Sequence, residues 1–476
     1  MKLKGILNDI PETLGNIELE SVTDDSRKVT QNSAFVCVKG PVSDGHDYAK
    51  KAAESGAAVI ICERDLGLEN QVIVPDSHKA LAQLCDAFYG YPLKRLKVVG
   101  VTGTNGKTSV CTMLKAILES CGHKTGVIGT IEHLIGDVSV PSKNTTPGAV
   151  ELRELFAKMV EAGCEYAVME VSSHALDQRR VEGITFEAAI FTNLTQDHLD
   201  YHKTMDEYFL AKTKLFSSCK KAVVNVDDPY GKRLITMLEC EYSTYSSESD
   251  ESTFSAKNIH YKPDGVDYEM VGFGIIGRIN LKIAGKFSVY NSLAAGVCAK
   301  ELGLPMNEIT EALSGISGVK GRAEVVPTGK DFTVVIDYAH TPDGLQNILK
   351  TFRECPKNRL IAVFGCGGDR DKTKRPQMGA IAARLADFVI VTSDNPRTED
   401  PSLIIKDIVA GMKGISTPCK VIENRIQAIK FAVANAKSGD IIVLAGKGHE
   451  TYQIIGSDTI HLDEREIVAE ALAQLQ

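Results

Sequence analysis

Several features typical of other protein classes are missing from this sequence. Its 476 residues carry 54 basic and 62 acidic side chains, so the chain lacks the positive charge of nucleic-acid-binding proteins. The 12 cysteines include no C-x-x-C pair and follow no secretion-type leader, which favours a reducing compartment. No apolar run approaches the roughly 18 residues that a membrane-spanning helix needs. We therefore expect a soluble, cytoplasmic protein that neither binds nucleic acid nor inserts into a membrane.

The length and the apolar pattern indicate an α/β protein of three domains. At about 150 residues per domain, this length corresponds to roughly three. Short β-like runs alternate with helical patterns along the chain, as in parallel α/β sheets. We expect domains at 1–92, 93–323 and 324–476, with residues 91–92 as a linker. A polar stretch, 243–255, is interpreted as a surface loop without a chemical role.

The stretch 98–109 is the most informative part of the sequence. An apolar run feeds a glycine-rich loop that ends Gly-Lys-Thr-Ser, and a helical pattern follows. Such a loop wraps backbone N–H groups around phosphate oxygens at the N-terminus of a helix. Lys107 then reaches the terminal phosphates, and Thr108 offers a hydroxyl to Mg²⁺. Val101 stands where the usual spacing has a glycine, so the loop is a compact variant of the common phosphate loop.

Further ligand-type side chains follow other apolar runs, as expected where parallel strands end. Glu170 ends one such run and can hold the Mg²⁺ that bridges nucleotide phosphates. Taken alone, a glutamate at that place is more often solvated or caps a helix. His198, within the polar stretch 192–202, is a candidate second metal ligand or an ordinary loop histidine.

Lys212 is predicted to lie on the apolar face of a helix. If 206–216 is helical, Tyr208 and Phe209 fall on its side, whereas Lys214 points the opposite way. Desolvation of such a lysine lowers its pKa and leaves a nucleophilic amine, which can capture CO₂ as a carbamate. The alternative is a lysine whose stem covers the apolar surface while its ammonium reaches water.

Taken together, the motifs resemble those of the Mur ligases, a family of ATP-dependent amide ligases in peptidoglycan synthesis. The resemblance extends over the whole chain. The matching blocks are Gly-Thr-Asn-Gly-Lys-Thr at 103–108, Glu-Val-Ser-Ser-His at 170–174, Asn-Leu-x-x-Asp-His-Leu-Asp-Tyr-His at 193–202, Ala-Lys-x-x-Leu-Phe at 211–216, Tyr-Asn at 290–291, Gly-Arg-x-Glu at 321–324 and Asp-Tyr-Ala-His-Thr-Pro-Asp at 337–343.

This resemblance implies an N-terminal UDP-substrate domain, a central phosphate-loop ATPase-like domain with a parallel sheet, and a C-terminal Rossmann-like domain that binds an amino acid. It implies amide-bond formation driven by ATP hydrolysis to ADP and phosphate, with two Mg²⁺ ions and a carbamate on Lys212. Lys107, Lys212 and His198 are the implied catalytic residues. Implied nucleotide contacts are Gly103, Thr104, Asn105, Gly106, Lys107, Thr108, Ser109, Asn291, Arg322 and Asp337. Implied metal ligands are Thr108, Glu170, His198 and Lys212.

The family pattern also implies the acid substrate, UDP-N-acetylmuramoyl-L-alanyl-D-glutamate. In the implied reaction, its D-glutamate γ-carboxylate attacks the γ-phosphate of ATP and forms an acyl phosphate. The incoming amine then attacks the acyl carbon, and phosphate leaves. Taken alone, Arg180 would be a solvated cation at a helix end. The residues implied to bind this substrate are Ser26, Asn144, Thr145, Thr146, Ser172, Gln178 and Arg180.

The stretch 394–397 resembles the motif of family members that add meso-diaminopimelate. Arg370 and Arg397 can each bind a carboxylate in a forked arrangement, and Asp394 and Glu450 can hold an ammonium. Lysine lacks the distal carboxylate, so an arginine would remain unpaired at a cost of about 2–5 kcal/mol. Taken alone, the tetrapeptide would be a turn. The implied acceptor contacts are Arg370, Asp394, Asn395, Pro396, Arg397, Gly446 and Glu450.

Two other interpretations stay open from the sequence. One is a lysine-adding or folylpolyglutamate-synthase-like ligase, against which the 394–397 motif and the domain of Ser26 count. The other is a binding protein switched by ATP or GTP, although the Asn-Lys-x-Asp base motif of GTPases is missing.

Overall fold

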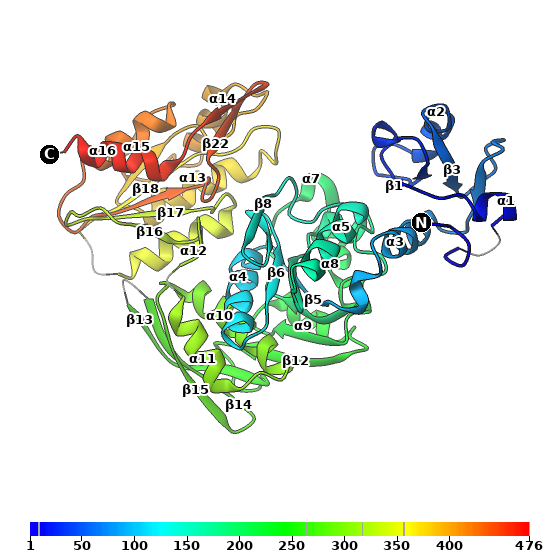
Figure 1. Ribbon diagram of the computed structural model, residues 1–476. Coiled ribbons are helices and arrows are strands. Elements are labelled where there is room, and N and C mark those ends of the chain that lie inside the picture. Colours follow the sequence, from blue (N-terminus) through cyan, green and yellow to red (C-terminus); the bar gives the residue numbers. More distant parts are fainter. Residues whose placement is uncertain (8–9, 263–264, 317, 356–357, 476) are drawn as a thin grey trace.

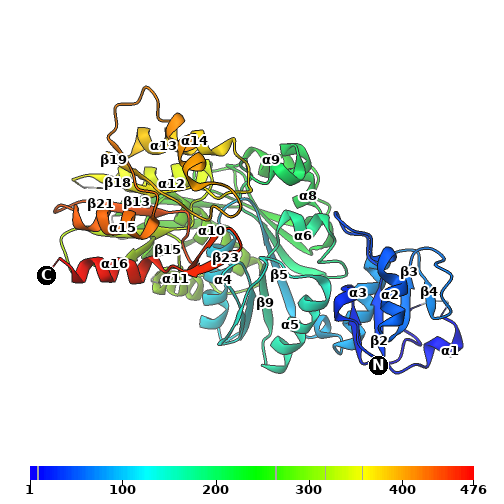
Figure 2. The same cartoon turned by 90° about the horizontal axis from the view of Figure 1, so that it is seen from above.

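Among the described residues, three large β-sheets follow one another along the chain, and each lies inside one of the three predicted segments. This computed structural model describes residues 1–7, 10–262, 265–316, 318–355 and 358–475. Figures 1 and 2 show the N-terminal lobe at one end of the molecule and the C-terminus at the other. Helices and mainly parallel strands confirm the expected α/β class. Among the described residues, no helix has the length and apolar character needed to cross a bilayer.

The first sheet has four parallel strands in chain order and a small apolar core. Among the short β-like runs of the sequence, those at 34–38, 59–62 and 72–74 correspond to its last three strands. The long helix of this lobe begins after Asp76, whose side chain accepts the N–H of Lys79. Its elements are α1 (Glu12–Gly15), β1 (Ser21–Thr23), η1 (Ser26–Lys28), β2 (Ser33–Val36), η2 (Gly45–Tyr48), α2 (Ala49–Glu54), β3 (Ala57–Cys62), β4 (Gln71–Ile73), α3 (Ser77–Phe88) and η3 (Pro92–Lys94).

The central sheet has eleven strands. Its elements are β5 (Lys97–Thr102), α4 (Lys107–Ser120), β6 (Thr125–Ile128), β7 (Glu132–Ile135), β8 (Val138–Pro141), α5 (Ala149–Glu161), β9 (Tyr166–Glu170), α6 (Ser173–Asp177), β10 (Phe186–Phe191), α7 (Leu199–His202), α8 (Met205–Thr213), η4 (Phe216–Ser218), β11 (Lys221–Asn225), α9 (Pro229–Ile235), β12 (Glu241–Ser246), β13 (Phe254–Lys262), β14 (Gly265–Gly272), β15 (Ile275–Leu281), α10 (Lys286–Glu301) and α11 (Met306–Gly315). Strands β13, β12, β11, β10, β5, β9 and β6 run parallel, and antiparallel strands extend both edges. The carboxyl ends of β5, β9 and β10 therefore meet at one edge of the sheet. The polar residues at these strand ends lie along the same edge.

The expectation of a surface loop at 243–255 is wrong at both ends, because the first residues lie in β12 and residues 254–255 begin β13. Residues 243–246 belong to β12, and Ser246 is fully buried. The backbone N–H of Thr244 donates to the hydroxyl of Thr253 at 3.0 Å, and the N–H of Thr253 donates to the hydroxyl of Thr244 at 2.9 Å. Each hydroxyl thus accepts the backbone N–H of the other threonine, which explains how so polar a sequence forms a strand.

The C-terminal lobe contains the third sheet, which has six strands, and a separate two-stranded antiparallel sheet formed by 452–455 and 458–461. Its elements are β16 (Glu324–Val326), β17 (Thr333–Asp337), α12 (Pro342–Arg353), β18 (Leu360–Phe364), α13 (Lys374–Leu385), β19 (Phe388–Val391), α14 (Pro401–Ala410), β20 (Cys419–Val421), α15 (Arg425–Ala434), β21 (Ile441–Ala445), β22 (Tyr452–Ile455), β23 (Asp458–His461) and α16 (Glu464–Ala473). Strands β17, β21, β18, β19 and β20 run parallel, with β16 antiparallel at one edge. Helices α12, α13 and α14 cover one face, and α15 and α16 cover the other. The loops after β17, β18, β19 and β21 all leave the same edge.

A buried ion pair joins the first two lobes. Arg153 of α5 is fully buried, and its Nε donates to Oδ1 of Asp86 of α3 at 3.1 Å. Its Nη2 also donates to the carbonyl of Glu182. Removing one partner of such a pair leaves an uncompensated charge in a poorly solvated place.

Replacing Arg153 with methionine is expected to lower the free energy of unfolding by about 3 kcal/mol, because Asp86 loses its partner. Circular dichroism during urea unfolding measures this effect in a chain that contains no tryptophan. Lys158→Met is the matched control, since Lys158 lies on the same helix in an exposed pair with Glu154 and its loss should cost under about 1 kcal/mol. Equal effects of the two variants would contradict the structural role of the buried pair.

Candidate active site

The glycine-rich loop between β5 and α4 has the shape that its sequence predicts. Gly103 and Gly106 have φ values of +146° and +90°. A Cβ atom on Gly103 would lie 1.9 Å from Oγ1 of Thr192, and one on Gly106 would lie 2.4 Å from Oδ1 of Asn291. Only glycine fits both places, because each is closely approached by a neighbouring side chain. The loop is therefore held tightly against the end of β10 and against α10.

A cavity of about 860 Å³ lies between this loop and the C-terminal lobe. An apolar wall formed by Ile259, Tyr261, Phe287 and Tyr290 faces it, a surface suited to a planar ring. Of this wall, the sequence motifs include only Tyr290, in the Tyr-Asn block at 290–291, and the other three residues belong to no motif. Gly103 and Lys212 are not among the lining residues. The predicted site residues that line the cavity are Thr104, Asn105, Gly106, Lys107, Thr108, Ser109, Thr145, Glu170, His198, Asn291, Arg322 and Asp337.

Two buried ammonium groups converge on one carbonyl of the loop. Nζ of Lys107 donates to the carbonyl oxygens of Gly103 and Thr104, both at 2.9 Å. Nζ of Lys212 also donates to the Gly103 oxygen at 2.9 Å. Burial lowers the pKa of both lysines, and the charge of Lys107 lowers the pKa of Lys212 further. Asp197 favours the charged form of both lysines, but burial outweighs its effect.

The surroundings of Lys212 confirm its predicted orientation. Helix α8 ends at Thr213, earlier than the predicted end at residue 216. Lys212 is 1% exposed, and its Nζ lies 4.5 Å from the centre of the Tyr208 ring. Lys214 is half exposed and pairs with Asp177. The interpretation of Lys212 as a lysine whose ammonium reaches water is thus wrong.

The predicted metal ligands Thr108 and Glu170 are in direct contact. The hydroxyl of Thr108 donates to Oε1 of Glu170 at 3.0 Å, and both the N–H and the hydroxyl of Thr130 donate to the same carboxylate at 2.9 Å. Oxygen donors of this kind suit Mg²⁺. Among the described residues, no group of three or more His, Cys, Asp or Glu side chains is arranged to hold a metal alone. The donor set thus fits an ion that takes its remaining ligands from phosphate and water.

His198 faces the cavity from a strained loop position. Its φ is +54°, and its ring lies edge-on to that of His174 at 4.8 Å. Nε2 of His198 lies 3.4 Å from Oδ2 of Asp197. Burial lowers the pKa of both histidines, so the imidazoles stay neutral and keep a lone pair for a ligand.

Four of the predicted acid-substrate residues form a second cluster. Arg180 donates from Nη1 to the Thr146 carbonyl at 2.8 Å and from Nη2 to Oε1 of Gln178 at 2.7 Å. The backbone N–H of Ser172 donates to the Thr146 hydroxyl at 3.0 Å. Arg180 is thus a bound cation instead of a solvated one. Ser26, at the start of η1, and the exposed Asn144 make no hydrogen bond to this cluster within the part of the chain that the structure describes.

Loops after β18, β19 and β21 bring the predicted acceptor residues together. A Cβ on Gly367 would lie 2.9 Å from Nη1 of Arg397 and 3.9 Å from Cγ of Arg370, so both arginines flank this glycine. Nδ2 of Asn395 donates to Oε2 of Glu450 at 2.9 Å. Pro396, which lies between Asn395 and Arg397 in the chain, is buried. A Cβ on Gly446 would lie 2.4 Å from Oδ2 of Asp394, so only glycine leaves room for that carboxylate.

Asp343 is a site residue that the sequence did not single out. It lies in the first turn of α12 and accepts the Nδ2–H of Asn105 at 2.8 Å, which ties the phosphate loop to the C-terminal lobe. Arg322, near the end of the predicted central segment, contacts the start of α4, since its Nη2 donates to the Thr108 hydroxyl at 3.0 Å. Asp343 is the last residue of the 337–343 block, so the motif contained the signal without indicating its partner.

Comparison with known proteins agrees with this geometry. Three family models match: "Mur ligase family, catalytic domain" over 18–89, "Mur ligase middle domain" over 101–299 and "Mur ligase, glutamate ligase domain" over 321–448. A curated relative from Clostridium acetobutylicum, UDP-N-acetylmuramoyl-L-alanyl-D-glutamate--2,6-diaminopimelate ligase 1, is 47% identical over 100% of both chains.

Solved structures extend the likeness to the fold. A structure of UDP-N-acetylmuramoyl-L-alanyl-D-glutamate--2,6-diaminopimelate ligase matches with a TM-score of 0.74 and 32% identity, over 100% of this chain and 99% of that one. The MurF ligase of Thermotoga maritima in complex with ADP matches with a TM-score of 0.63 at 19% identity, over 95% and 97%, and shows the shared fold. Because three Mur ligase models match successive segments of the chain, and a curated relative is 47% identical over its full length, the chain belongs to the Mur ligase family.

Proposed function

We propose that this ligase joins meso-2,6-diaminopimelate to the D-glutamate γ-carboxyl of UDP-N-acetylmuramoyl-L-alanyl-D-glutamate, at the expense of ATP, in cytoplasmic peptidoglycan synthesis. The observation that carries the proposal is the phosphate loop facing the C-terminal lobe across one cavity, in a chain that matches diaminopimelate ligases over its full length. The cytoplasmic assignment rests on 12 free cysteines, which suit a reducing compartment. We retain 1–92, 93–323 and 324–476 as the domain bounds.

The loop and its neighbours are proposed to bind and orient ATP. Backbone N–H groups of residues 103–109 and the ammonium of Lys107 hold the phosphates, while Asn291, Arg322 and Asp337 contact the adenine, phosphates and ribose. Arg322 is placed for this role because it already reaches the Thr108 hydroxyl. Positioning and charge neutralisation supply most of the catalysis in phosphoryl transfer. The γ-carboxylate thus forms an acyl phosphate, and the acceptor amine displaces phosphate from it.

Thr108, Glu170, His198 and a carbamate on Lys212 are proposed to hold two Mg²⁺ ions. These ions would neutralise phosphate charge when bound. The carbamate forms when the neutral Lys212 amine attacks CO₂ and loses one proton. Two observations support it: the residue is enclosed, and Lys107 already donates to the same carbonyl, which disfavours a second positive charge. A carbamate converts that cation into an oxygen ligand.

The two remaining substrates are assigned to the other clusters. The UDP-muramoyl dipeptide is proposed to bind to Ser26 and to the cluster around Arg180, which adjoins the Glu170 carboxylate through Thr145 and Thr130, whose hydroxyls lie 3.0 Å apart. Diaminopimelate is proposed to bind between the loops at 367–370, 394–397 and 446–450, with its distal carboxylate on the arginines.

The first test offers the two acceptors separately. Phosphate release from MgATP and UDP-N-acetylmuramoyl-L-alanyl-D-glutamate should occur with diaminopimelate and be at least about 30-fold slower with lysine, which corresponds to about 2 kcal/mol. Equal release with lysine would keep the ligase and overturn the acceptor assignment. Slow hydrolysis that ignores both acceptors would overturn the ligase and favour a nucleotide switch.

Lys212→Ala should lose at least about 100-fold in activity, because the metal loses an oxygen ligand. Added acetate or propionate should restore part of this activity by occupying the vacated space as a carboxylate ligand. Lys214→Ala, on the exposed side of the same segment, should remain active and insensitive to these acids. A loss at Lys212 without any rescue would argue against a carbamate.

Arg397→Ala should raise the KM for diaminopimelate about 30-fold and leave the KM for ATP within about twofold, since a charged contact to a partly buried carboxylate contributes about 2 kcal/mol. Arg384→Ala, at the exposed end of α13, is the matched control and should change neither constant. A parallel rise in both KM values would remove Arg397 from the acceptor site.

A further inference from the structure

Lys447 is a buried lysine to which neither the motifs nor the proposed reaction assigns a role. Its side chain is fully buried at the loop that follows β21. Nζ donates to Oδ1 of Asn395 and to Oε2 of Glu450, both at 2.9 Å, and lies 3.8 Å from Oδ1 of Asp394. An internal ammonium therefore already occupies the space between the two carboxylates that the sequence assigned to the ammonium of the ligand.

The contacts of Lys447 fix the orientation of the Asn395 amide. Oδ1 of Asn395 accepts from Lys447 and from the backbone N–H of Ile454 at 3.0 Å, which occupies both of its lone pairs. Nδ2 of Asn395 must then point the other way, where it donates to Oε2 of Glu450. Without the ammonium, the amide could turn over, and it would present an oxygen where it now presents N–H groups.

The carboxylate of Glu450 is fixed by the same two neighbours. Oε2 accepts from both Lys447 and Asn395. Oε1 makes no hydrogen bond within the described part of the chain. One oxygen of Glu450 is thus committed to the protein and the other is left for a ligand donor. Asp394, Glu450 and Lys447 together have a formal charge of −1, so this group of three can still accept an ammonium of the ligand.

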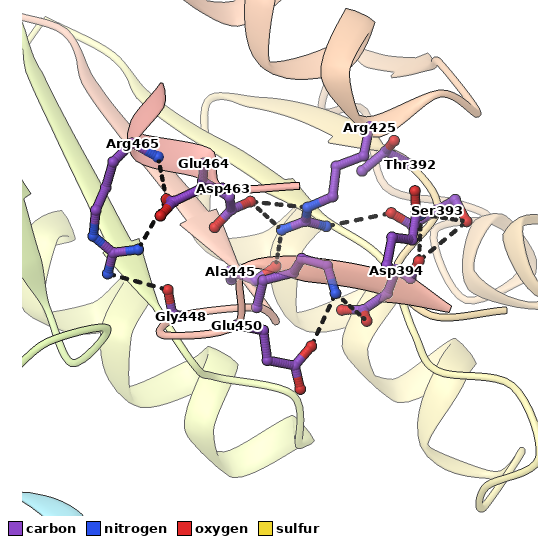
Figure 3. A network of polar contacts seen from close by, with 12 residues as sticks. Thr392, Ser393, Asp394, Arg425, Ala445, Gly448, Glu450, Asp463, Glu464 and Arg465 are labelled. Atoms are coloured by element: carbon purple, nitrogen blue, oxygen red, sulfur yellow. Dashed lines mark hydrogen bonds and ion pairs between the residues drawn. The ribbon is translucent and has the colours of Figure 1, made fainter. Parts of the chain in front are cut away.

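A second buried cation anchors the loops on which this arrangement sits. Figure 3 shows Arg425 between Glu464 and the chain at Ser393. Arg425 and Glu464 are both fully buried and lie 2.8 Å apart, and Nη2 of Arg425 donates to the Ala445 carbonyl at 2.8 Å. The loops that follow β19 and β21 are therefore braced at their bases, so a change at Lys447 acts on Asn395 and Glu450 without releasing the strands.

We propose that Lys447 is a positioning residue of the acceptor site, which sets the Asn395 amide and the free Glu450 oxygen toward the distal amino-acid end of diaminopimelate. The inference rests on the proposed function. Lys447 acts through its two neighbours and touches no reacting atom.

The test compares Lys447→Met with the wild-type enzyme in two assays. The KM for diaminopimelate should rise at least tenfold, while the KM values for ATP and the UDP-muramoyl dipeptide stay within about twofold. Acyl phosphate formation from MgATP and the dipeptide without acceptor, trapped with hydroxylamine, should keep its wild-type rate. Lys430→Met, which removes an exposed lysine that pairs with Glu470 on the same lobe, is the control and should change neither assay.

The outcomes separate this inference from the proposed function. An unchanged KM for diaminopimelate in K447M, or a rise shared by all three substrates, would overturn the role of Lys447 while an active wild-type enzyme keeps the proposed function. A wild-type enzyme that makes no product with diaminopimelate would overturn both. If K447M does not fold, Lys447→Gln retains an N–H donor without the charge. The KM of that variant should rise about three- to tenfold, and a wild-type value would overturn the proposal.

Discussion

The site depends on the confinement of positive charge at one carbonyl oxygen. Lys107 and Lys212 both donate to Gly103, where Lys212 is enclosed by protein and Lys107 lines the cavity. Two ammonium groups that share one acceptor in a poorly solvated place repel each other strongly. The arrangement is favourable only when anionic oxygens enter or when one amine becomes neutral. Anionic oxygens beside these ammonium groups would relieve the repulsion, which is a form of electrostatic preorganisation.

The sheets place the functional loops around this site so that several substrates can bind close together. Strands β5, β9 and β10 deliver the phosphate loop, Glu170 and the 192–198 segment to one edge of the central sheet. The C-terminal sheet presents its own carboxyl edge to the same cavity. Because parallel strands place functional loops at one edge, two such edges face to face can bring an activated acid and an amine together.

Much of this organisation could be predicted from the sequence because its causes are local. Apolar runs fixed most strands of the parallel sheets, and the order strand, glycine loop, lysine, hydroxyl identified the phosphate loop. Helical spacing alone placed Lys212 inward. What escaped prediction depends on contacts between distant residues. Residues 243–246 form a strand because hydroxyl groups pair with Thr253, and the partners Asn105 and Asp343 are 238 positions apart.

The link between Asn105 and Asp343 has an evolutionary consequence. The C-terminal lobe touches the phosphate loop through the segment that follows β17, whereas the proposed acceptor loops follow β18, β19 and β21. One lobe thus separates the surface that contacts the nucleotide loop from the surface that is proposed to bind the amino acid. Substitutions in the recognition loops can accumulate without weakening the grip on the nucleotide loop. A lineage built on this plan can explore new amino acids while its energy-coupling step remains intact.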